Sequence, residues 1–165
     1  MRSSLLALLA AAVVVAFAVV LTKQCSGESK PNAAPGQASD SAMPLPTPNG
    51  EVILTITQGG KLLRQWSLAD LKAAVPFVTV TVDGEDENGP LLTEVLRASG
   101  VTLWTRGVAV GKGPGLATSV EEKFEAGQVD KTWVLDVTNR NTLKLAAASL
   151  TRQHWVRDVT EIRLD

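Results

Sequence analysis

Apolar and polar positions alternate at two different periods along residues 51–165, and this predicts short strands interleaved with short helices. The segment EVILTIT (51–57) is β-branched and apolar, which is typical of a strand. Gln58-Gly59-Gly60 then predicts a turn into a returning strand through Leu62 and Leu63. The segment PFVTVTVD (76–83) repeats with the period of two that a half-buried strand shows. Further strands are expected at 106–110, 132–137, 142–147 and 155–164.

Helical signals are fewer and local. Ser67 and Asp70 have the spacing of a capping box and predict a short helix that Pro76 ends. The segment 91–100 places leucine and valine on one stripe, with Pro90 in the first turn and Gly100 as the C-terminal cap. A further short helix is expected at 119–126, while GEDENG (84–89) is interpreted as a loop. Strands outnumber helices, so the sequence predicts one small α+β domain with mixed or antiparallel sheets and short helices.

The first 24 residues have a different pattern. Leu5 to Leu21 contains no polar side chain, and as a helix the segment Leu5–Thr22 would measure roughly 27 Å, close to the hydrocarbon thickness of a bilayer. Residues 1–24 are therefore interpreted as a signal peptide or an N-terminal membrane anchor. Cys25, the only cysteine, follows at the position of a lipidated cysteine, although Thr22, Lys23 and Gln24 are unlike a lipoprotein signal. Cleavage, lipidation and retention as an anchor all stay open.

Residues 25–50 contain five prolines and little that is apolar, which predicts a disordered linker. The organisation is therefore leader (1–24), linker (25–50) and domain (51–165). We expect the domain to lie on the extracytoplasmic side of a bacterial cell membrane, or to be exported after cleavage. Removing Arg2 and Lys23 with the leader leaves 14 of the 16 basic side chains against 17 acidic ones, a net charge of −3. This charge argues against nucleic-acid binding.

The order of the segments resembles the sulfite-oxidase-type molybdopterin-binding domain. The resemblance covers residues 51–165 and depends on three motifs, a capped helix, a Gly-Leu-rich helix and a late Trp-Val strand. The matching positions are Ser67, Leu68, Asp70 and Leu71; Gly89, Leu92, Val95, Leu96, Gly100 and Val101; and Trp155, Val156, Arg157, Val159 and Ile162. Most of them are core or cap positions, so the resemblance implies the fold more than the chemistry.

Two departures from this family bear on function. Its enzymes hold molybdenum through a cysteine thiolate between the first two motifs, and residues 77–90 contain no cysteine. The chain also has a single histidine, His154, so no set of nucleophile, base and acid is available around it. We therefore expect a minimal relative without a catalytic or metal site. We expect no cofactor, and molybdopterin is the alternative that the resemblance implies.

Candidate ligand-binding residues come from two stretches. Gly111, Lys112 and Gly113 belong to a glycine-rich loop whose N–H groups and charge suit a phosphate or carboxylate. Arg152, His154 and Arg157 form a basic cluster near the C-terminus. For Arg152 and His154, which precede the last strand, the resemblance implies contacts with the pterin phosphate. The structural alternatives are a turn between strands for the first stretch and the solvated face of a last strand for the second.

The sequence thus predicts a membrane-tethered, non-catalytic binding module that takes an envelope protein partner or a small anionic ligand. The alternative is a degenerate oxidoreductase subunit that still binds molybdopterin or a related anion. Convergence of Lys112 and Arg152 on one pocket would favour the alternative.

Overall fold

The computed structural model describes residues 44–113 and 118–165. The predicted leader, Cys25 and most of the predicted linker lie outside these residues. Residues 44–50 contain neither helix nor strand, and the main-chain N–H of Asn49 donates to Asp70 Oδ2 at 2.9 Å. Within the described ranges there is no helix of the length and apolar character needed to cross a membrane.

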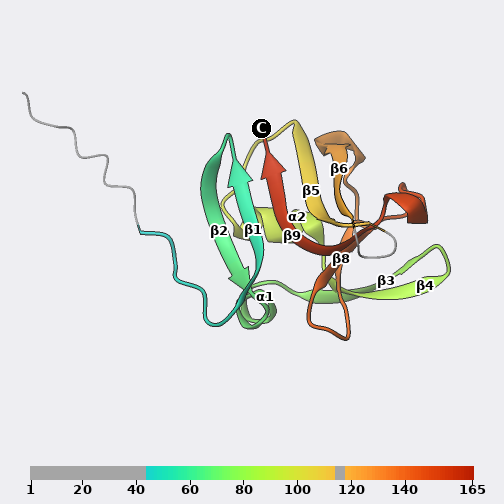
Figure 1. The fold of residues 1–165 in the computed structure, drawn as a ribbon, viewed down its shortest axis with the longest axis horizontal. Coiled ribbons are helices and arrows are strands. Elements are labelled where there is room, and N and C mark those ends of the chain that lie inside the picture. Colours follow the sequence, from blue (N-terminus) through green and yellow to red (C-terminus); the bar gives the residue numbers. More distant parts are fainter. Residues whose placement is uncertain (1–43, 114–117) are drawn as a thin grey trace, which may run out of the picture. The chain divides into compact units, whose positions relative to one another are not determined.

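The described residues form a mostly-β domain with two short α-helices (Figure 1). In chain order the elements are β1 Val52–Gln58, β2 Lys61–Ser67, α1 Leu68–Ala74, β3 Phe77–Val82, β4 Glu85–Pro90, α2 Leu92–Ala98, β5 Arg106–Lys112, β6 Ser119–Glu125, the 3₁₀ turn Ala126–Gln128, β7 Val134–Val137, β8 Leu143–Ala146, the 3₁₀ turn Arg152–His154 and β9 Val156–Leu164.

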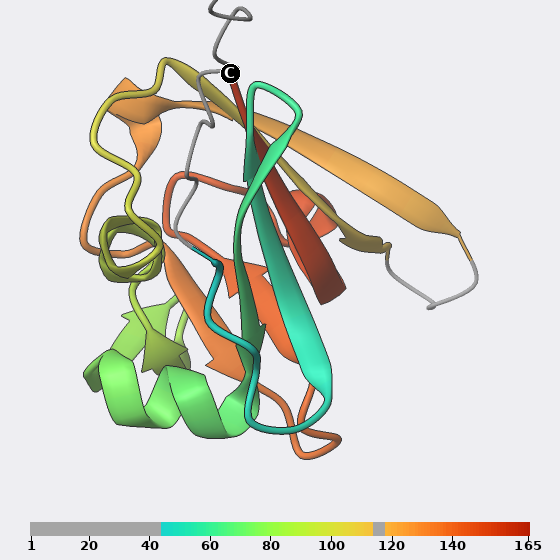
Figure 2. The ribbon, with the colours of Figure 1, turned by 90° about the vertical axis from the view of Figure 1, so that its left-hand side faces the viewer.

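The main sheet is mixed. Its strands follow the order β2-β1-β9-β5-β6, and β8 adds β7 to the sheet by pairing with β9. β1 and β9 are parallel, while every other pairing among the described strands is antiparallel. Figure 2 shows both helices on the same side of this sheet. The expectation of mixed and antiparallel sheets with short helices is confirmed.

Local signals placed both helices where the sequence predicted them. The Ser67 side chain accepts a hydrogen bond from the Asp70 N–H and so caps α1. Gly100 follows α2 at φ 85°, and the Val101 N–H returns to the Leu96 carbonyl, which closes the helix as a glycine C-terminal motif does. The apolar stripe of α2 packs into the core with Trp66, whose Nε1 donates to Ser99 Oγ at 2.9 Å.

Three expectations were wrong. Residues 84–89 are not a loop, because Asp83 and Gly84 form a tight turn that sends β4 back along β3. Pro90 consequently ends β4 instead of opening α2. Residues 119–126 are not a helix, because Ser119–Glu125 pairs along its whole length with β5 and forms an edge strand.

A bulge in β9 changes which side chains share a face. Asp158 has φ 43°, and the register with both neighbouring strands shifts there. Val159 is therefore buried with Val156 and Ile162, whereas simple alternation placed it on the side of Arg157. Towards the C-terminus, Arg163 pairs with Glu121 and Glu161 on the solvated face.

Candidate functional site: a basic pocket beside a buried ion network

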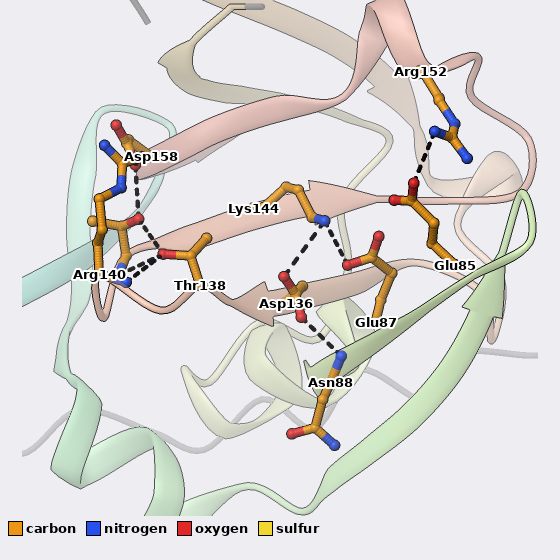
Figure 3. Close-up of polar contacts among 10 residues, drawn as sticks. Glu85, Glu87, Asn88, Asp136, Thr138, Arg140, Lys144, Arg152 and Asp158 are labelled. Atoms are coloured by element: carbon orange, nitrogen blue, oxygen red, sulfur yellow. Dashed lines mark hydrogen bonds and ion pairs between the residues drawn. The ribbon is translucent and has the colours of Figure 1, made fainter.

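A buried ion network joins β4, β7 and β8 (Figure 3). Lys144 on β8 places its Nζ 2.6 Å from Glu87 Oε2 and 3.5 Å from Asp136 Oδ2. The other oxygen of Asp136 accepts the main-chain N–H of Asn88 at 2.8 Å. Burial is deep, since the side chains of Glu87 and Lys144 are 3% and 17% exposed. The network therefore attaches the β3–β4 hairpin to β7 and β8.

Burial and ion pairing shift the pKa of Glu87 in opposite directions. Desolvation raises the pKa of this carboxyl above its ordinary value, and the nearby Lys144 ammonium lowers it to a smaller extent. The burial effect dominates, and Glu87 Oε1 has no hydrogen-bond partner among the described residues. Glu87 belongs to the segment 84–89 that the sequence analysis interpreted as a loop, and it is instead a buried residue of β4.

A second carboxylate organises the bulge of β9. Asp158 Oδ1 accepts from Arg140 Nη2 at 2.8 Å and from Thr142 Oγ1 at 2.7 Å. Lys112 Nζ on β5 lies 3.6 Å from the other carboxylate oxygen. The Thr142 hydrogen bond, followed by the charges of Arg140 and Lys112, lowers the pKa of Asp158. Asp158 thus stays ionised and keeps two cations beside Arg157.

A surface pocket of about 500 Å³ is lined by residues of both ion-pair groups. Residues of β7, β8, β9 and the β7–β8 turn line it: Asp136, Thr138, Asn139, Arg140, Lys144 and Arg157. Three of these side chains are cationic. Arg140 and Lys144 are engaged as described above, whereas Arg157 is exposed and has no ion-pair partner within residues 44–113 and 118–165.

The structure brings some of the predicted ligand-binding residues together. Lys112 is the direct cross-strand neighbour of Arg157. Gly111 lies where a Cβ would come 2.5 Å from the Arg157 carbonyl oxygen, so only glycine fits beside the bulge. Gly113 follows β5, and its N–H donates to the Thr118 carbonyl. Residues 114–117 of the same loop lie outside the described part.

Arg152 and His154 are held by other carboxylates. Arg152 makes ion pairs with Asp83 and Glu85 at the tip of the β3–β4 hairpin. His154 Nδ1 lies 2.9 Å from Glu122 Oε2 on β6. Arg152 and Arg157 line different hollows. Lys112 pairs with Asp158 and shares no ion-pair partner with Arg152 among the described residues. The ion pairs therefore do not bring Lys112 and Arg152 together at one site.

Sequence reasoning missed Arg140 and Lys144, which contribute as much positive charge to the pocket as Arg157 does. Arg140 was detectable only as part of a turn-forming stretch, Thr138-Asn-Arg-Asn141, between two predicted strands. Asn141 has φ 60°, as expected of asparagine in a tight turn. Arg140 and Lys144 meet Arg157 only because β8 pairs with β9, and no local sequence signal predicts this pairing.

A larger hollow of about 710 Å³ lies near the ends of β5, β6 and β9. Its arginines are already matched, Arg106 with Asp165 and Arg163 with Glu121. The part of the chain that the structure describes has no group of three or more His, Cys, Asp or Glu side chains placed to hold a metal ion. The chain matches no model of a known protein family and no curated protein sequence.

Proposed function

We propose that this protein is a membrane-tethered, non-catalytic binding module whose pocket between β7, β8 and β9 holds a small anionic ligand. The pocket has the size of a small-molecule site, about 500 Å³, and three cationic side chains line it against one carboxylate, that of Asp136. Asn139 adds an amide, which can donate hydrogen bonds to an oxyanion, whereas the Thr138 hydroxyl is already bonded to Thr142 Oγ1 at 2.8 Å. An anion is the ligand class that this combination of groups binds best.

The observation that carries the proposal is that the Arg157 guanidinium has no carboxylate partner among the described residues. Arg140 and Lys144 each have a carboxylate within 2.8 Å, whereas Arg157 has none among the described residues. Arg157 also faces Lys112 directly across the β5–β9 pair, and like charges in that position are unfavourable. A bound anion would relieve this repulsion and would give the guanidinium a bidentate partner.

The fold relationship proposed here is to sulfite-oxidase-type domains. Support comes from the order of the three sequence motifs, the capped α1, the α2 helix ending at Gly100 and the terminal strand that begins after Trp155. The donor set does not fit the family's metal centre. Molybdenum in these enzymes needs a thiolate, and residues 44–113 and 118–165 contain no cysteine. No catalytic step through such a centre is therefore derived.

Anion binding is tested by titrating the full-length protein, in detergent micelles, with inorganic phosphate and with sulfate in a calorimeter. Arg157→Ala should weaken binding by about tenfold or more, because one charge-assisted contact contributes roughly 1.5–3 kcal/mol. Arg97→Ala is the matched control, since Arg97 is exposed, pairs with Glu94 on α2 and does not line the pocket. Equal binding by the two variants, or no measurable binding by the wild type, would refute the proposal.

Metal and pterin analysis of the purified protein separates this function from the alternative of a degenerate oxidoreductase subunit. Molybdenum and pterin near one equivalent per chain would favour the oxidoreductase relationship and would reject a purely non-catalytic module. Phosphate binding without either component is the outcome expected here.

A further inference from the structure

Strand β3 has one edge that no described strand covers. It pairs with β4 alone, in a hairpin that Figure 1 shows extending away from the main sheet. The two turn residues, Asp83 and Gly84, have φ 52° and 79°, which is the type I′ geometry of a two-residue hairpin. The opposite edge of β4 lies against β7, where Asn88 bonds to Asp136.

The hairpin geometry determines which main-chain groups of β3 face outward. In a two-residue hairpin the residues flanking the turn, here Val82 and Glu85, form a hydrogen-bonded pair. Pairing alternates along the strand, so the N–H and C=O groups of Phe77, Thr79 and Thr81 point to the open edge. Within the described ranges no main-chain hydrogen bond outside the hairpin involves these residues.

This edge lacks the features by which proteins protect open strands. β3 reads FVTVTV and contains no charge, proline or glycine. The two end strands of the main sheet differ in this respect, because β2 carries Lys61 and Arg64 and β6 carries charged residues at four of its seven positions. An uncharged, β-branched open edge is a template for pairing with another strand.

The order of residues in β3 indicates which strand would pair there. Val78-Thr79-Val80-Thr81-Val82 is the same when read in either direction. A second copy related by a twofold axis through Val80 would therefore place valine opposite valine and threonine opposite threonine. Such self-complementarity is the requirement of an isologous interface.

We propose that two copies of this chain associate through antiparallel pairing of β3, forming the continuous sheet β4-β3-β3-β4. Thr79 of each copy lies opposite Thr81 of the other, and both residues present outward main-chain groups, so their hydrogen bonds are in register. Val80 meets its own copy at the axis. β3 carries no charged side chain, so the two copies do not repel one another at this interface.

The two faces of this sheet have different roles. Thr79 and Thr81 are exposed and bond across the hairpin to Asn88 and Asp86. Val80 and Val82 face the other side and pack against the small cluster of Val134, Ala146 and Trp155. Because β3 does not line the anion pocket, dimer formation and anion binding are separable.

Cysteine cross-linking of the full-length chain tests both the contact and its register. A Thr79→Cys chain and a Thr81→Cys chain, carrying different tags and the Cys25→Ser change, are expressed together and mildly oxidised in membranes. Directly opposed residues lie within the Cα separation that a disulfide needs. A reducible dimer carrying both tags is expected, at several times the yield from Thr102→Cys expressed with Thr81→Cys. Thr102 is exposed and lies outside every strand, so it serves as the control.

The mass of the detergent-solubilised protein, measured by light scattering, provides the second test. The wild type should have the mass of a dimer and Thr79→Pro that of a monomer with unchanged circular dichroism. Proline at Thr79 removes an outward N–H and the exposed side-chain hydrogen bond from Asn88, and proline is tolerated at an open edge. A monomeric wild type, or a doubly tagged yield no greater than that of the Thr102 control, would overturn the proposal.

Discussion

Replacing Asp158 by asparagine tests how the bulge of β9 is stabilised. The substitution removes one negative charge, keeps the shape of the side chain and leaves Oδ1 as an acceptor for Arg140 and Thr142. Asparagine also tolerates the positive φ of 43° at this position. The change therefore isolates the contribution of the charge from that of packing and backbone strain.

The size of the effect follows from the contacts. A hydrogen bond to a charged group contributes roughly 1.5–3 kcal/mol and a neutral one roughly 0.5–1.5 kcal/mol, so the Thr142 bond, which becomes neutral, should weaken by about 1 kcal/mol. The Arg140 bond should weaken by less, because the guanidinium stays charged. The side chains of Arg140 and Lys112 are 51% and 52% exposed, so solvent screening reduces the ion-pair contribution. The free energy of unfolding should fall by about 1.5 kcal/mol in total.

The pH dependence provides a further check. The folded protein lowers the pKa of Asp158 below its ordinary value of 3.8. A carboxyl with a lowered folded-state pKa stabilises the protein fully above the unfolded pKa, and this stabilisation is lost as the pH falls through the folded value. The difference between wild type and variant should therefore be constant near neutral pH and should shrink below about pH 4.

Urea unfolding of the full-length protein in micelles, followed by tryptophan fluorescence, measures this difference, because all four tryptophans lie in the described domain. Asp86→Asn is the control, since Asp86 accepts a hydrogen bond from Thr81 but is exposed. It should change the unfolding free energy by less than about 0.5 kcal/mol. An Asp158→Asn effect no larger than this, or one that does not change between pH 7 and pH 3, would contradict the reasoning.

Two further substitutions test the network that attaches the β3–β4 hairpin. Because burial raises the folded-state pKa of Glu87, ionisation of this carboxyl costs stability as the pH rises above about 4.5. Glu87→Gln should therefore gain stability relative to wild type with rising pH. A pH-independent difference between the two in urea unfolding would refute this. Gly89→Ala would place a Cβ 2.0 Å from the Leu135 carbonyl oxygen and should cost about 3 kcal/mol, whereas Gly127→Ala, which meets nothing within 4 Å, should be close to neutral in the same assay.

Self-association through β3 also limits how the chain can be arranged at a membrane. The composition of residues 25–50 predicts a flexible linker, and chains of this kind and length span several nanometres, which is enough for two tethered domains to meet. If the N-terminal segment is retained as an anchor, as we propose, association through β3 would have to occur between copies in the same membrane. Cross-linking in intact membranes therefore examines the dimer under the conditions in which it would form.

Elements with a signal in a few neighbouring residues were determined by the sequence itself. Ser67 caps α1 and Gly100 closes α2, because each supplies a hydrogen bond or a positive φ that the local backbone needs. The turn Asp83-Gly84 also had its signal, a pair typical of type I′ hairpins. The charged composition of GEDENG obscured it, and β4 was missed for this reason.

Other features were decided only by tertiary structure. Ser119–Glu125 has the spacing of a helix cap, yet pairing with β5 makes it a strand, because an exposed strand edge satisfies more main-chain groups than a short helix does. The sequence identified Arg157 as part of a basic cluster, but Arg140 and Lys144 reach it only through the pairing of β8 with β9. The bulge at Asp158 reverses the alternation of side chains along β9, and this reversal determines which of these charges meet. The bulge itself follows from contacts between strands that are distant in the sequence.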